Sequence, residues 1–211
     1  MTTPLLFALL VLPLSASAQN PAADSILQEV DATAAALQDA TLVQTLEVSA
    51  ADGTTKNSLD LKTRVKGVNT VLTVTGPADA KGFALFFSGP DTTYAVLPAF
   101  GRRVRRLGPD GKSQSFFGTD IMTGDLYAAP YAASWTPALV ETTLGQWVLA
   151  LTSKKQPARK IKIWVDRSTK RVVKTEATGE NGGVSTLRVV SAETNTGLPD
   201  ALFTKTGFAA D

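Results

Sequence analysis

The sequence predicts an α+β fold, in which a strongly curved antiparallel sheet of about ten strands forms an unclosed half-barrel and helices cover its concave face. One helical pattern near the start is followed by a long series of segments in which apolar and polar residues alternate. Short turns containing Gly, Pro or Asp separate these segments, which favours antiparallel pairing of neighbours. The length of the series predicts one large sheet, because a sheet of this size curls.

Residues 1–18 are predicted to be a secretory signal peptide. An apolar run from Leu5 to Leu14 ends in Ala16-Ser17-Ala18, which is typical of a cleavage site. The run has about ten residues, half of what a membrane-spanning helix needs. We find no linker or repeat after it, so residues 19–211 are expected to form one mature domain in the periplasm.

The composition excludes several classes of function. The sequence has no cysteine and no histidine, which removes a lipidation site, the usual nucleophile and histidine triads, and the common zinc, copper and haem ligands. The net charge of +2 is too small to indicate a nucleic-acid partner. We therefore expect no catalytic residues, no metal and no cofactor.

The first predicted element is an amphipathic helix over residues 21–37. Its apolar residues recur at helical spacing, and Asp24 and Ser25 are candidate N-caps. The alternating segments predict strands over residues 42–48, 57–65, 68–75, 82–87 and 92–97, and again over 138–144, 146–152, 160–165, 171–177 and 184–191.

Most of these strands carry apolar residues two positions apart, which places them on one face of the sheet. We expect these faces to line an apolar cavity on the concave side; an ordinary core between sheet and helices explains them equally well. The expected lining residues are Leu59, Leu61, Leu72, Val74, Phe83, Leu85, Phe87, Tyr94, Val96, Trp147, Leu149, Ile161 and Ile163.

Residues 97–127 interrupt the alternation. Arg102, Arg103, Arg105 and Arg106 occupy a short strand with charge on both faces, which predicts an edge strand. The arginines either protect that edge from aggregation or form a basic patch that docks on lipid phosphates or an acidic partner.

A short helix ending at Leu126 is predicted next, capped by Thr119 or Asp120. Its apolar residues either form a lid over the cavity or pack as an ordinary helix; they are Phe116, Phe117, Ile121, Met122 and Leu126. Asp120 and Asp125 are expected to be a cap and a solvated acid.

Several motifs, taken in order, resemble the LolA/LolB-like outer-membrane lipoprotein-sorting superfamily. They are the helix ADSILQEVD at 23–31, FFGTD at 116–120 followed by Asp125-Leu126, KIWVDRSTKRVVKT at 162–175 and LPDALFT at 198–204. The resemblance implies an unclosed barrel whose mouth is covered by helices, with an apolar cavity between them. It also implies a carrier of acylated molecules across the periplasm.

The expected function is that of a soluble, monomeric carrier or chaperone. Its expected partners are the acyl chains of lipids or lipoproteins, with an inner-membrane transporter as donor and an outer-membrane acceptor. The alternative is a sensor or adaptor of the same fold that binds a protein partner.

Overall fold

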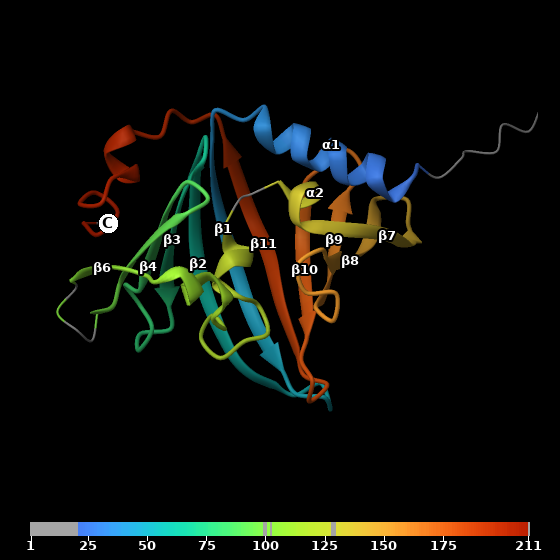
Figure 1. The fold of residues 1–211 in the computed structure, drawn as a ribbon, viewed down its shortest axis with the longest axis horizontal. Coiled ribbons are helices and arrows are strands. Elements are labelled where there is room, and N and C mark those ends of the chain that lie inside the picture. Colours follow the sequence, from blue (N-terminus) through green and yellow to red (C-terminus); the bar gives the residue numbers. More distant parts are fainter. Residues whose placement is uncertain (1–20, 99–100, 102, 128–129, 211) are drawn as a thin grey trace, which may run out of the picture.

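The computed structural model describes residues 21–98, 101, 103–127 and 130–210 (Figure 1). The predicted signal peptide and Arg102 lie outside these residues. One 11-stranded antiparallel sheet dominates the described part of the chain and does not close into a barrel. This confirms the predicted fold class, with one strand more than the ten that the alternation marked. No helix in the described ranges is long and apolar enough to cross a membrane.

The strand order is β6-β5-β4-β3-β2-β1-β11-β10-β9-β8-β7. The chain therefore moves outward from the centre to one edge at β6, crosses to the other edge at β7, and returns to pair β11 with β1. The strands are β1 (Asp39–Ser49), β2 (Thr55–Lys66), β3 (Asn69–Gly76), β4 (Ala84–Ser88), β5 (Thr92–Val96), β6 (Val104–Arg106), β7 (Trp135–Thr142), β8 (Gln146–Ser153), β9 (Lys160–Asp166), β10 (Val172–Thr178) and β11 (Val184–Thr194).

Helices are few. α1 (Ala23–Ala35) is shorter than predicted at both ends, and neither predicted N-cap is one, because Ala22 precedes the first turn without a side-chain cap. Its buried residues Ile26, Leu27 and Val30 pack on the sheet. The other helices among the described residues are α2 (Tyr131–Ser134) and the 3-10 helices η2 (Pro109–Ser113), η3 (Thr123–Leu126) and η4 (Asp200–Phe203).

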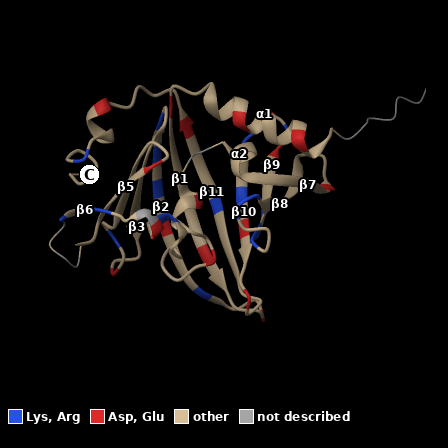
Figure 2. Ribbon diagram, viewed as in Figure 1, with Lys and Arg blue, Asp and Glu red and all other residues tan. Residues whose placement is uncertain are grey.

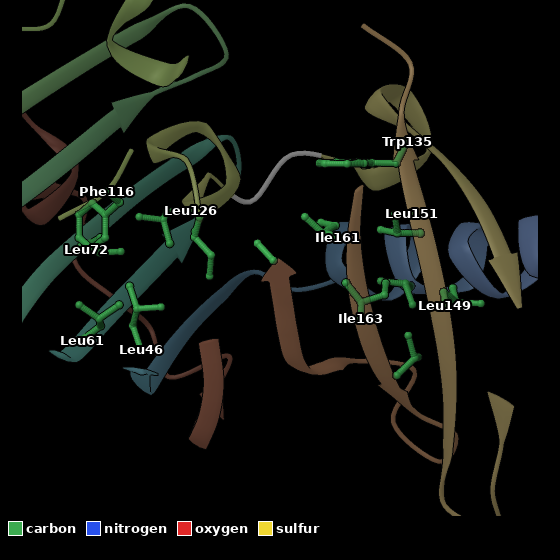
Figure 3. Packing of buried hydrophobic residues seen from close by; sticks show 14 of the residues in the cluster. Leu46, Leu61, Leu72, Phe116, Leu126, Trp135, Leu149, Leu151, Ile161 and Ile163 are labelled. Carbon is green, nitrogen blue, oxygen red and sulfur yellow. The ribbon is translucent and has the colours of Figure 1, made fainter. Parts of the chain in front are cut away.

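One face of the sheet, here called the inner face, carries most of the buried apolar side chains. Directly paired residues of neighbouring antiparallel strands lie on the same face. A single row of such pairs crosses seven strands, through Leu59, Leu46, Leu187, Thr175, Ile163, Leu149 and Leu139. Figure 3 shows part of the cluster of buried side chains to which this face contributes.

A second, smaller cluster lies on the opposite, outer face. Phe203 and Phe208 of the C-terminal segment (residues 198–210) pack there on side chains of β3, β4 and β5. The buried carboxylate of Asp39 anchors the start of this segment, because it accepts hydrogen bonds from the backbone N–H groups of residues 196, 197 and 198 at 2.8 to 3.0 Å. The C-terminus thus lies on the outside of the curved sheet (Figure 1).

Tyr94 and Val96 do not lie where the alternation placed them. Tyr94 is paired with Phe86 and Val96 with Ala84, and all four belong to the outer cluster. Ala95, paired with Leu85, is the residue of β5 that joins the inner cluster. The prediction was wrong because side chains on both faces of β5 are buried, so that alternation alone could not identify the inner one.

Candidate functional site

The crossing between the two edges of the sheet forms the candidate site. After β6 the chain must reach β7 on the opposite edge, and residues 107–127, here called the covering segment, begin that crossing over the inner face (Figure 1). Three of its apolar side chains, Phe116, Ile121 and Leu126, are 1% to 7% exposed and belong to the inner cluster. Figure 3 shows Phe116 and Leu126 near Leu72.

A tight turn replaces the predicted helix within the covering segment. The Phe116 N–H donates to the Ile121 carbonyl at 3.0 Å, and the Thr119 N–H donates to the Phe116 carbonyl at 3.1 Å. Phe117 and Gly118 between them have φ values of 51° and 72°. Positive φ at both central positions ends a helix and makes a hairpin turn. Neither Thr119 nor Asp120 caps a helix here, and only the short η3 follows.

The other two predicted lid residues are less buried. Phe117 is 39% exposed at the tip of the turn, where its ring lies 5.0 Å from the ring of Phe83. Met122 is half-buried. The covering segment therefore presents one buried apolar side to the sheet and one aromatic residue to solvent.

The inner face beneath the covering segment and α1 is filled by side chains. Every predicted lining residue except Tyr94 and Val96 belongs to the inner cluster or, as Phe83 does, packs against it. Two open surface pockets of about 540 and 300 Å³ lie elsewhere, beside Trp147 and Arg167 and beside Trp164 and Arg188. Neither is lined by the covering segment.

The covering segment is attached to the sheet mainly through side chains. At its start the Leu107 N–H donates to the Thr93 carbonyl at 2.8 Å. In its middle the Asp120 N–H donates to the Ser185 hydroxyl at 2.9 Å, and at its end the Tyr127 hydroxyl donates to the Val68 carbonyl at 3.2 Å. No named strand of the sheet pairs with its central part. It can therefore leave the inner face without breaking a strand ladder.

An ion pair also holds the end of the covering segment. The Arg159 guanidinium, in the loop between β8 and β9, contacts the Asp125 carboxylate, and the two side chains are 16% and 14% exposed. Asp125 also accepts a hydrogen bond from the Met122 N–H at 2.9 Å, and the guanidinium lies 5.0 Å from the Trp135 ring. Asp125 is therefore a paired, mostly buried acid, whereas the sequence predicted a solvated one.

α1 and α2 are joined by another carboxylate. Asp31 accepts hydrogen bonds from the N–H groups of Tyr131 and Ala132 at 2.7 and 2.9 Å. Burial and the negative charges of Asp125 and Asp31 together raise the pKa of the Tyr131 hydroxyl to about 12, against the opposing effect of a hydrogen bond with Thr175. No sequence signal identifies Asp31, Arg159 or Ser185, because single polar residues become partners only through the fold.

The predicted basic patch lies at the β6 edge of the sheet, as expected from its charge. Arg103, Arg105 and Arg106 are exposed, and Figure 2 shows basic residues at that edge. Arg105 is paired with Ala95 of the inner cluster and Arg106 with Tyr94 of the outer one. The described residues contain no group of three or more acidic side chains placed to hold a metal.

The chain was compared with models of protein families and with curated proteins. A family model described as that of an uncharacterized protein matches residues 66–185, which is more than half of the chain. No curated protein matches.

Two solved structures have a similar fold. One is a putative outer membrane lipoprotein-sorting protein domain from Vibrio parahaemolyticus, 18% identical, with a TM-score of 0.64 over 89% of this chain and 98% of that one. The other is a LolA superfamily protein from Nitrosomonas europaea, 21% identical, with a TM-score of 0.57 over 88% of this chain and 98% of that one. At these identities the likeness concerns the fold.

Proposed function

We propose that this chain, which shares the fold of LolA-like proteins, is a periplasmic carrier which binds the acyl chains of lipids or lipoproteins on its inner face and transfers them between membranes. The observation that carries this proposal is the covering segment. It buries apolar side chains on an apolar sheet face, yet no strand pairing fixes its central part there. The segment is the lid of the proposed site.

The structure corresponds to the closed state in this proposal. Phe116, Ile121 and Leu126 occupy the positions that an acyl chain takes when this part of the covering segment moves away. The proposed lining residues beneath them are those of the inner cluster, including Leu61, Leu72 and Leu85.

The free energies favour such an exchange. Burying each of the three lid side chains contributes about 1.5 to 3 kcal/mol, so exposing them costs about 5 to 9 kcal/mol. Removing a sixteen-carbon acyl chain from water gains on the order of 12 kcal/mol, at about 0.8 kcal/mol per CH2. The free energy gained by removing the acyl chain from water therefore exceeds the cost of opening the lid by a small margin. A small net free energy of binding suits a carrier, because cargo must also leave for an acceptor membrane.

Native mass spectrometry of gently purified protein tests the proposal. We expect a stoichiometric bound lipid mass, or uptake of a fluorescent long-chain fatty acid by lipid-free protein. Protein that carries no lipid and never takes up the probe contradicts the proposal. A stoichiometric protein partner from a periplasmic extract, without lipid, supports the sensor or adaptor alternative instead.

A further inference from the structure

Two buried threonine hydroxyls on the inner face have no hydrogen-bond partner among the described residues. Thr70 in β3 is 0% exposed and Thr93 in β5 is 4% exposed, and the Oγ1 atom of each is unpaired. Both are paired directly with Phe87 of β4, one from each side, so the three side chains form a row on one face. An unpaired buried hydroxyl costs about 1 to 3 kcal/mol, which favours a role in binding.

A cation lies above the same row. The Nζ atom of Lys112, in η2 of the covering segment, is 5.9 Å from the centre of the Phe87 ring and 5.0 Å from that of Tyr127. It donates a hydrogen bond to the Pro90 carbonyl and makes no ion pair within the described ranges. Burial lowers the pKa of the Lys112 ammonium, nearby Lys155 lowers it as well, and the Asp91 charge opposes both. A partly buried cation without a carboxylate partner is stabilised by an anion.

These polar groups lie at one end of the apolar face. The next row along the strands consists of Leu72, Leu85 and Ala95, and Val74 follows Leu72 on the same face of β3. From Thr70 to Val74 the face extends about 13 Å, at about 3.4 Å per residue. Donors at one end of an apolar strip match a ligand with a polar head and an apolar tail.

We propose that Thr70, Thr93 and Lys112 bind the anionic head, a carboxylate or phosphate, of an amphiphile whose tail lies on Leu72, Leu85 and Val74 in place of the covering segment's apolar side chains. Thr70 and Thr93 lie two strand spacings apart, about 10 Å, on either side of Phe87, so the head accepts hydrogen bonds from the ammonium and from one of the two hydroxyls. This inference rests on the proposed function and adds to it a polarity: the head lies at the Lys112 end.

Three fluorescent probes with one long acyl tail test the inference: the fatty acid, its methyl ester and the corresponding alkyl phosphate. We expect wild-type protein to bind at least one anionic probe about tenfold or more tightly than the ester, which corresponds to one charge-assisted contact. The tighter of the two anions identifies the head. In the Thr70→Val, Thr93→Val double variant and in Lys112→Met, this preference falls to threefold or less, while affinity for the ester is unchanged.

Thr73→Val is the matched control. Its hydroxyl is also buried and unpaired, but Thr73 is paired with Ala84 of the outer cluster. The control must keep the wild-type preference. In the absence of ligand, all three valine substitutions should leave the melting temperature unchanged or raise it, because each removes an unpaired polar group.

The outcomes separate the two proposals. Equal binding of acid, phosphate and ester by wild-type protein overturns the headgroup inference and leaves the carrier intact. An anion preference that survives in every variant also overturns it. Protein that binds none of the probes contradicts the carrier itself.

Discussion

The Asp31 carboxylate accepts a hydrogen bond from the backbone N–H of Tyr131 at 2.7 Å, across 100 residues of sequence. A second bond, to the N–H of Ala132 at 2.9 Å, completes a cap on the first turn of α2. The contact joins the helix that precedes the sheet to the short helix that follows the covering segment. It therefore fixes the far end of the crossing.

Replacing Asp31 by alanine should destabilise the protein by about 1 to 2 kcal/mol, the usual cost of losing a helix cap. Urea denaturation followed by circular dichroism measures the change. Asp24→Ala is the control, because Asp24 is an exposed acid in the first turn of α1 that caps nothing. Equal stability of the two variants contradicts the capping role.

The pKa of Tyr131 predicts a loss of stability at alkaline pH. The hydroxyl titrates at about 12 in the folded protein and at about 10 when unfolded. Between these pH values the folded state holds a proton that the unfolded state has lost, so the free energy of unfolding falls as pH rises. Relative to Tyr131→Phe, wild-type protein should lose about 2 to 3 kcal/mol over this range. Parallel pH profiles for the two proteins would refute the assignment.

The Asp125–Arg159 ion pair should slow lid opening. Asp125→Asn removes the charge that pairs with the partly buried guanidinium, which weakens the closed state by an amount on the order of 1 to 3 kcal/mol. Stopped-flow uptake of a fluorescent fatty acid should become about tenfold faster. Glu176→Gln breaks another ion pair, with Lys174, away from the covering segment and should have no effect. Unchanged uptake in a folded Asp125→Asn variant contradicts this role.

Two phenylalanines on opposite faces should respond differently to truncation. Phe208→Ala leaves a cavity under the C-terminal segment, costs about 3 to 5 kcal/mol and loosens the segment so that trypsin cleaves it after the exposed Lys205, without affecting probe affinity. Phe116→Ala removes a side chain that competes with the acyl tail and should raise probe affinity. Proteolysis with mass spectrometry and probe titration measure both effects. A shared effect on probe affinity would contradict the separation of the two faces.

Much of the fold could be predicted from the sequence because alternation is a local signal. Leu85 and Phe87 mark the inner face of β4 correctly, and the arginine run marks the edge strand. Tyr94 and Val96 form an equally apolar stripe, but pairing places them under the C-terminal segment. Which face is inner depends on what covers it, and that is decided by distant parts of the chain.

Local sequence patterns could not predict the polar residues of the site. Thr70 and Thr93 are ordinary strand-forming residues, and only the pairing of both with Phe87 brings them into one row. Arg159 and Asp125 are 34 residues apart in the sequence, and only the fold brings them together as an ion pair. In FFGTD, Thr119 and Asp120 suggested a helix cap, whereas Phe117 and Gly118 adopt the positive φ values of a hairpin turn.

The central claim is that acyl chains bind only when the part of the covering segment from Phe116 to Leu126 leaves the inner face. The Asp120 N–H contacts the Ser185 hydroxyl at 2.9 Å, and the chain has no cysteine of its own, so Asp120→Cys with Ser185→Cys can introduce a single disulfide that locks the segment in place. The oxidised double variant should not take up a fluorescent fatty acid, and reduction of the same sample should restore uptake to the wild-type level. Equal uptake by the oxidised and reduced forms would contradict the account.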